Sequence, residues 1–311
     1  MDKDARIYVA GHRGMVGQAI VRRLEAEGYA APITRTHGEL DLTDQAAVRA
    51  FFEAERPSHV FLAAAKVGGI LANDSYPADF IRDNLAIQTN VIDAAWRSGA
   101  QKLLFLGSSC IYPRDAAQPI REDYLLTGPL EPTNQWYAIA KIAGIKMCQA
   151  YRQQHGFNAI CTQPTNVFGP GDNYDPETSH VLAALIRKFH EAVRRGDETV
   201  TVWGTGRPQR EFIHVDDLAD ACLFLMKTYD EPDIINIGTG KDISIADLAA
   251  LIGEIAGFKG TIVYDSDKPD GTPRKLLDVG RLSALGWQAQ IPLKAGIART
   301  YEEAAALLDD G

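Results

Sequence analysis

The sequence predicts an α/β fold in which a doubly wound parallel sheet is joined to a smaller C-terminal α/β domain. Short apolar runs rich in β-branched residues alternate with longer helical patterns through the first half of the chain, as a parallel sheet with crossover helices requires. A glycine-rich turn follows the first of these runs. After Phe168 the segment GPGDNYDPETSH is typical of a loop, so a second region is expected to begin there.

Five strands and four helices are expected in the first region. The strands cover apolar runs at residues 6–10, 31–36, 59–65, 102–108 and 158–164. The helices cover the longer patterns between them, at residues 14–28, 43–56, 76–99 and 137–155. Thr43 is the expected N-cap of the second helix, and Gly28 and Gly99 are expected to stop the first and third.

The second region mixes further strands and helices. Helical patterns occupy residues 180–195, 216–227 and 244–257, and strand-like runs lie at 199–203, 211–215, 234–240 and 261–265. We expect residues 211–238 to return to the first domain. The predicted division is therefore 1–170 with 211–238 for the first domain, and 171–210 with 239–311 for the second.

Composition and charge limit the function classes. The 311 residues are 46% hydrophobic and 23% charged, which is ordinary for a folded protein, and suit one large domain or two modest ones. A net charge of −9 opposes general binding to nucleic acid or to an anionic membrane. No secretory or transit peptide is recognisable and no run of apolar residues is long enough to span a bilayer, so a cytoplasmic protein is expected.

The four cysteines give no metal-binding pattern. They lie far apart with no CxxC spacing, which fits a reducing compartment. Cys148, Cys161 and Cys222 stand in apolar surroundings and are expected in the core.

The turn after the first strand predicts a dinucleotide site. Its glycines are spaced G-x-x-G-x-x-G, between a strand and a helix, as in a Rossmann-type fold. Glycine lets backbone N–H groups and a helix N-terminus approach a pyrophosphate, whereas the alternative is a tight structural turn. The predicted cofactor-binding residues of this loop are Gly11, His12, Arg13, Gly14, Met15, Val16 and Gly17.

The end of the second predicted strand favours NADP(H) over NAD. An NAD enzyme tends to place an acid there, but this strand ends Ile33-Thr-Arg-Thr36. Arg13 and Arg35 could instead hold a ribose phosphate, unless both are only solvated surface residues.

A tyrosine and a lysine four residues apart predict acid–base chemistry. Tyr137 and Lys141 share one helix face, and a nearby ammonium favours phenolate and so lowers the pKa of a tyrosine. Ser108 ends the fourth predicted strand, at the edge of the sheet where ligands bind.

At these residues the chain resembles the extended short-chain dehydrogenase/reductase family. The resemblance extends over nearly the whole chain, through AGHRGMVG, LAAAKVGGI, FLGSSCIYP, EPTNQWYAIAKIAG, PTNVFGP, WGTGRPQREFIHVDD and KPDGTPRKLLD. Within that family it implies an NADPH-dependent enzyme that inverts carbons 3 and 5 of GDP-4-keto-6-deoxy-D-mannose and reduces carbon 4 to give GDP-L-fucose. It also implies a homodimer built from helices 76–99 and 137–155. The alternatives are a nucleotide-sugar 4-epimerase or 4,6-dehydratase that keeps NAD bound, and a non-catalytic NADP-binding sensor.

The resemblance assigns roles to five catalytic residues. Tyr137 would protonate the oxygen at carbon 4, Ser108 would hydrogen-bond it, and Lys141 would hold the nicotinamide ribose. Cys110 and His180 would move the protons at carbons 3 and 5, because a free thiol with a pKa of about 8.5 and an imidazole both exchange protons near neutrality. The alternatives are a buried filler for Cys110 and a solvent-facing helix start for His180, while His12, His59 and His214 are taken as structural.

The remaining predicted contacts fall on two sides of this centre. Further cofactor contacts are expected at Leu106, Gly107, Lys141, Pro164, Thr165, Asn166, Val167 and His180. By the same resemblance, Trp203, Arg210, Asp270 and Lys275 are expected to contact the GDP-sugar. Lys188, Arg210 and Lys275 could each neutralise oxygens of its diphosphate. For Trp203 a place in the core is the alternative.

Overall fold

The computed structural model describes residues 1–176, 178–268 and 270–310, so Glu177 and Pro269 in the quoted motifs, and Gly311, lie outside the described residues. The central layer is a parallel sheet in the order β1 (Ile7–Ala10), β2 (His59–Leu62), β3 (Lys102–Leu106), β4 (Ala159–Pro164), β8 (Ile235–Ile237). Every residue of these strands is buried, because helices cover both faces of the sheet. The predicted fold class is confirmed.

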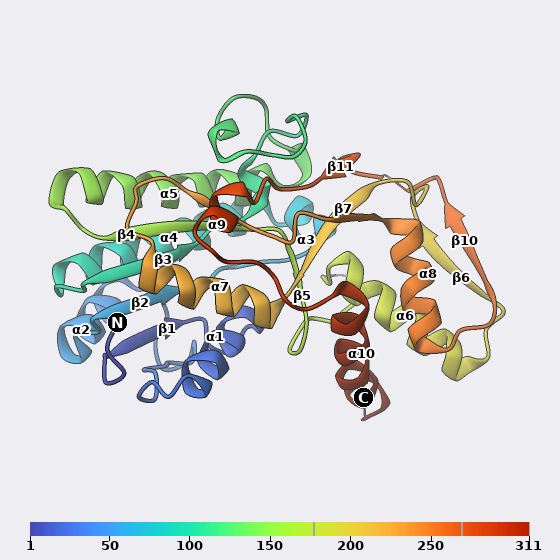
Figure 1. Cartoon of the computed structure of the whole chain (residues 1–311), viewed down its shortest axis with the longest axis horizontal. Coiled ribbons are helices and arrows are strands. Elements are labelled where there is room, and N and C mark those ends of the chain that lie inside the picture. The colour runs from blue at the N-terminus through green and yellow to red at the C-terminus, as the bar shows by residue number, and fades with distance from the viewer. Residues whose placement is uncertain (177, 269, 311) are drawn as a thin grey trace.

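Helices cover the two faces of this sheet (Figure 1). One face carries α2 (Gln45–Glu55), α4 (Pro77–Arg97) and α5 (Gln135–His155), and the other carries α1 (Met15–Ala26) and α7 (Val215–Thr228). Each face encloses its own apolar cluster. Among the described residues, no helix is long and apolar enough to cross a membrane.

Two local predictions in this domain were wrong. Residues 31–36 form no strand, only an isolated bridge between Ile33 and Tyr8, because Pro32 has no N–H to continue a ladder. The N-cap of α2 is Asp44 and not Thr43, since the Asp44 carboxylate accepts from the N–H groups of Ala46 and Ala47.

The chain nevertheless changes direction at β1. Ile33 lies on one side of this strand and β2 on the other. The turn after β1 is therefore at a switch point of the sheet, where α/β proteins bind ligands.

The rest of the chain forms a second body beside the sheet (Figure 1). It contains α6 (Val181–Arg195), α8 (Ile245–Ala256) and α10 (Leu293–Asp310) around a third apolar cluster, with β6 (Thr199–Trp203) paired to β10 (Thr261–Asp265). A second small sheet joins the bodies and consists of β5 (Asn166–Phe168), β7 (Gln209–His214), β9 (Asp242–Ser244) and β11 (Arg274–Lys275). Short elements complete the chain, namely α3 (Ile70–Ser75), α9 (Gly280–Ala284), η1 (Ser109–Ile111), η2 (Glu122–Tyr124) and η3 (Pro132–Asn134).

We propose the domain division 1–170 with 211–238, and 171–210 with 239–311. The pairing of β8 with β4 and the packing of α7 on α1 support it, because both elements come from the returning segment.

Candidate active site

The glycine loop after β1 forms a closed turn against the start of α1. A Cβ on Gly17 would lie 2.1 Å from the Gly11 carbonyl oxygen, so only glycine allows this approach. Gly14 N donates to that same oxygen at 3.0 Å, and no side chain caps the helix. The first N–H groups of α1 therefore remain available to an anion, which fits the pyrophosphate of a dinucleotide.

Arg13 and Arg35 lie together at the far end of this loop. Both contribute to lowering the pKa of Glu39, after the larger effect of hydrogen bonds from Thr36. Arg35 is already paired with Glu55 at 2.6 Å, whereas Arg13 is exposed. The site can hold a phosphate with Arg13, but Arg35 would have to share its guanidinium with Glu55.

Ser108 is fixed at the end of β3 by a residue that the sequence reasoning missed. Its N–H donates to Gln163 Oε1 at 3.0 Å, and its Oγ accepts from Cys110 N at 3.2 Å. Gln163 is fully buried in β4, and a Cβ on Gly107 would lie 2.0 Å from Gln163 Oε1. The sequence signal for Gln163 was an amide side chain near the end of a mostly apolar strand, next to the strand that carries Ser108.

Tyr137 and Lys141 project from α5 towards β3. Lys141 Nζ donates to the Leu106 carbonyl oxygen at 2.8 Å and lies 5.7 Å from the centre of the Tyr137 ring. Burial lowers the pKa of Lys141 to about 8. Burial and the charge of Cys110 raise the pKa of Tyr137, and the hydrogen bond with Ser108 only partly opposes them. The predicted lowering of the pKa of Tyr137 was wrong, because burial outweighs the hydrogen bond with Ser108.

Cys110 lies in a small pocket between η1, η3 and β11. Its Sγ is 3.4 Å from Asn134 Nδ2 and 3.6 Å from Lys275 Nζ. Glu131 and Thr272 line the same pocket. Cys110 is half-buried, whereas the other three cysteines are buried in the core as predicted. Lys275, expected at the diphosphate, therefore contacts the thiol.

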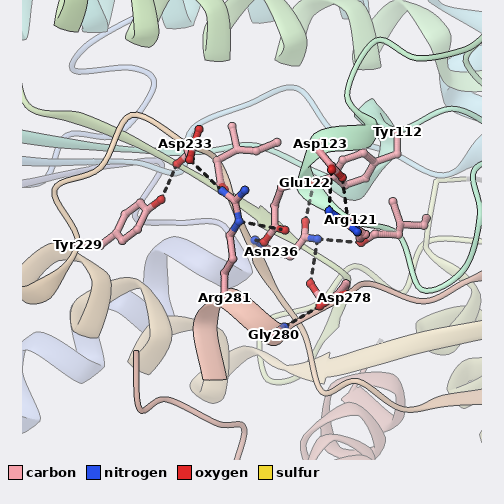
Figure 2. A network of polar contacts seen from close by, with 12 residues as sticks. Tyr112, Arg121, Glu122, Asp123, Tyr229, Asp233, Asn236, Asp278, Gly280 and Arg281 are labelled. Carbon is pink, nitrogen blue, oxygen red and sulfur yellow. Dashed lines mark hydrogen bonds and ion pairs between the residues drawn. The ribbon is translucent and has the colours of Figure 1, made fainter. Parts of the chain in front are cut away.

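A buried polar network anchors the turn that carries Cys110 (Figure 2). Tyr112 Oη donates to Asn236 Oδ1 at 2.6 Å, and Asn236 N donates to Glu122 Oε1 at 3.1 Å. Asn236 Nδ2 also donates to the backbone carbonyls of residues 120 and 278, each at 3.0 Å. Arg281 extends the network to Glu122 and Asp233. The chain just after Cys110 is thus tied to β8 in the central sheet.

His180 stands at the start of α6. Its imidazole is exposed to solvent and does not cap the helix, yet partial enclosure by protein lowers its pKa and keeps it mostly neutral near pH 7. Gly69 N donates to Thr178 O at 2.9 Å, and the following α3 packs on η3, which carries Asn134. One segment therefore touches both the His180 loop and the Cys110 pocket, although no hydrogen bond between the described residues joins His180 to Cys110.

Trp203 forms an exposed platform in the second body. Its side chain is 58% exposed, so the alternative of a core tryptophan is excluded. Lys188 Nζ lies 5.0 Å from the ring centroid, and Lys268 Nζ lies 5.5 Å from it. An aromatic face with two ammonium groups suits a planar base attached to a diphosphate.

Arg210 and Asp270 lie near each other between the bodies. Burial lowers the pKa of Arg210, which the charges of Asp270 and Glu131 oppose. Both oxygens of Asp270 accept from Thr205, each at 2.7 Å, and these bonds lower its pKa. The carboxylate of Asp270 thus closes the turn after β6.

The segment after β4 is held mainly by backbone contacts. Asn166 Nδ2 donates to Glu211 O at 2.7 Å and Thr165 Oγ1 to the same oxygen at 3.2 Å, while Thr165 N donates to Ile237 O at 2.9 Å. Pro164 ends β4 and Val167 pairs within β5.

The structure therefore brings the predicted catalytic and substrate-binding residues, other than His180, into three groups. Ser108, Cys110, Tyr137, Lys141 and Lys275 form one cluster, Lys188 and Trp203 a second, and Arg210 and Asp270 a third. No group of three or more metal-binding side chains occurs in the part of the chain that is described.

Comparisons with known proteins identify the family of this chain. The profile of the NAD dependent epimerase/dehydratase family matches residues 7–238. A putative GDP-L-fucose synthase 2 of Arabidopsis thaliana is 61% identical, with 97% of this chain and 92% of that protein aligned. The GDP-L-fucose synthase of Escherichia coli is 53% identical, with 96% and 95% aligned.

Solved structures show the same fold over the full length. A GDP-6-OMe-4-keto-L-xylo-heptose reductase from C. jejuni has a TM-score of 0.94 and 38% identity, covering 99% of each chain. A GDP-L-fucose synthetase from Naegleria fowleri bound to NADP has a TM-score of 0.91 and 27% identity, covering 99% of this chain and 96% of that chain. On the profile match and these similarities, the chain belongs to the NAD dependent epimerase/dehydratase family.

Proposed function

We propose that this chain is an NADPH-dependent enzyme that inverts carbons 3 and 5 of GDP-4-keto-6-deoxy-D-mannose and reduces carbon 4, yielding GDP-L-fucose. The observation that carries the proposal is the cluster of a serine, a tyrosine and a thiol around one point at the end of β3. Relatives with 53–61% identity over nearly the whole chain are named GDP-L-fucose synthase. The two alternatives, an epimerase that keeps NAD bound and a non-catalytic sensor, do not need a thiol beside Ser108.

The reduction uses Ser108, Tyr137 and Lys141. The cofactor, when bound, supplies the hydride for carbon 4. Tyr137 keeps its proton near neutral pH because burial raises the pKa of its phenol, so it can protonate the oxygen that becomes the alcohol. Ser108 hydrogen-bonds the same oxygen, and the Lys141 ammonium holds the ribose hydroxyls of the cofactor.

The two inversions use Cys110 and His180. Removing a proton from carbon 3 or 5 leaves an enolate, whose oxygen Ser108 and Tyr137 stabilise. Cys110 lies beside Ser108 and accepts protons on one side of the sugar ring. His180 is exposed, so it takes up a proton from water and, as an imidazolium, returns it to the carbon on the opposite side of the ring, while the Cys110 thiol releases its proton to water.

Cofactor choice, assembly and location belong to the same proposal. The neighbouring Arg13 and Arg35, and the NADP bound to the Naegleria protein, support NADP(H). We also propose a cytoplasmic homodimer in which α4 and α5, which lie side by side with Trp136 and Ile139 partly exposed, form the contact.

The test follows the absorbance of NADPH in the presence of GDP-4-keto-6-deoxy-D-mannose. We expect oxidation with the guanine nucleotide, little with the same sugar on uridine diphosphate, and slower oxidation of NADH. Absence of oxidation with either nucleotide would favour the non-catalytic alternative. Conversion without net oxidation of the cofactor would favour a 4-epimerase.

A further inference from the structure

Lys275 is an ammonium group without a carboxylate partner. Among the described residues, none of the ion pairs includes it, and its one hydrogen bond goes to Cys110 Sγ, at 3.6 Å. Its neighbour Arg274 behaves differently, because its guanidinium pairs with Asp242. Lys275 thus places an unpaired positive charge beside a thiol.

A second donor reaches the same sulfur from another element. Asn134 Nδ2, at the end of η3, is 3.4 Å from Cys110 Sγ. A thiolate accepts hydrogen bonds strongly and a thiol only weakly, so two N–H donors directed at one sulfur favour the charged form.

The other ionisable groups around Cys110 place no second cation in contact with its sulfur among the described residues. From α5, Tyr137 faces the sulfur as a neutral phenol. Glu131 and Arg114 line the pocket with opposite charges, and Arg114 is paired with Asp115 at 3.0 Å. Lys275 is therefore the cation in direct contact with the sulfur.

We propose that Lys275 is a positioning residue that, together with Asn134, holds Cys110 as a thiolate at neutral pH. The use of this thiolate rests on the proposed function. There, the proton leaves carbon 3 or 5 for Sγ, the electron pair of the broken C–H bond enters the enolate, and Lys275 remains protonated throughout.

The charge state is measured without any sugar substrate. Iodoacetamide alkylates thiolates, and the rate at the Cys110 peptide can be followed by mass spectrometry against pH. Cys148, Cys161 and Cys222 are at most 1% exposed, so in the folded protein Cys110 is the cysteine that reacts. We expect a midpoint well below the value of about 8.5 for a free thiol.

Replacing Lys275 is expected to move this midpoint upward. In Lys275→Met we expect a rise of about one pH unit, typical of losing an opposite charge at this separation. Lys275→Arg should restore most of the wild-type profile. Arg274→Gln removes the same charge one residue away, where the side chain is paired with Asp242, and should leave the midpoint unchanged.

Asn134→Asp provides an independent variant on another element. A carboxylate facing the sulfur should raise the midpoint in the same direction, even if Lys275→Met folds poorly. Unchanged profiles in both variants would overturn the proposal. A thiolate found in an enzyme that does not process the GDP-sugar would leave this inference standing and reject the proposed function instead.

Discussion

Individual residues divide the proposed reaction into two chemically separate parts. Tyr137 retains its proton because burial raises the pKa of the phenol, which suits an acid for the reduction. Cys110, beside Ser108 but contacted by different donors, suits the exchange of carbon-bound protons. In the proposed reaction the two side chains act on the same ketone, yet each should be removable without abolishing the step of the other.

Tyr137→Phe is expected to lower the rate of NADPH oxidation by about 100-fold or more, since a positioned general acid contributes that much. Incorporation of solvent deuterium at carbons 3 and 5 should persist. Cys110→Ser should show the reverse, with NADPH binding intact and most deuterium incorporation lost. Mass spectrometry of the recovered sugar measures the exchange. Full reduction by the phenylalanine variant, or undiminished exchange by the serine variant, would refute these roles.

At the scale of elements, the helices and most strands were predictable, including β6 and β10 with their exact bounds, whereas the shortest strands were not. Helices α1, α5 and α6 lie within a residue or two of their expected bounds, because caps and helical periodicity are local in the sequence. The strand expected at 31–36 fails at Pro32, and β5, β9 and β11 exist only through pairing with distant partners.

The same distinction applies to the candidate site. Ser108, Tyr137 and Lys141 could be found because their motif lies at a strand end and on one helix face. The contacts of Gln163 and Lys275 span 55 and 165 residues of sequence, so a local pattern can mark the Gln163 amide as unusual in its strand but cannot identify either partner.

Glu211 on β7 connects the two bodies through hydrogen bonds. This buried carboxylate on β7 accepts from the N–H groups of Thr239 and Gly240 on one oxygen, at 2.6 and 2.7 Å, and of Leu277 on the other, at 2.9 Å. Glu211→Gln has nearly the same shape but opposes one set of N–H groups with its own NH₂. We expect the free energy of unfolding to fall by about 1–3 kcal/mol, the cost of a buried unsatisfied donor.

Urea denaturation measures that change, and Glu254→Gln on the exposed face of α8 is the control. Glu254 is paired only with Lys294 on the surface, so its variant should unfold like the wild type. Equal free energies of unfolding for the two variants would show that the Glu211 hydrogen bonds do not stabilise the fold.

On the scale of the whole molecule, the proposed ligand site draws on both bodies, whereas the proposed dimer contact uses helices of the first body alone. The glycine loop and Ser108 come from the sheet, whereas Trp203 and Lys275 come from the second body. Helices α4 and α5 cover one face of the sheet (Figure 1), and α5 also carries Tyr137 and Lys141. A substitution at an exposed position of α5 should therefore change assembly without replacing a catalytic side chain.

Ile139→Glu tests this separation. Ile139 lies on α5 and is 38% exposed, while Val193 on α6 is 40% exposed but far from the proposed contact. We expect light scattering to give twice the mass of one chain for the wild type and for Val193→Glu. Ile139→Glu should give a single chain, because a carboxylate buried in an apolar contact without a partner is strongly unfavourable. A wild-type protein of single-chain mass would reject the dimer, and a dimeric Ile139→Glu would place the contact on another surface.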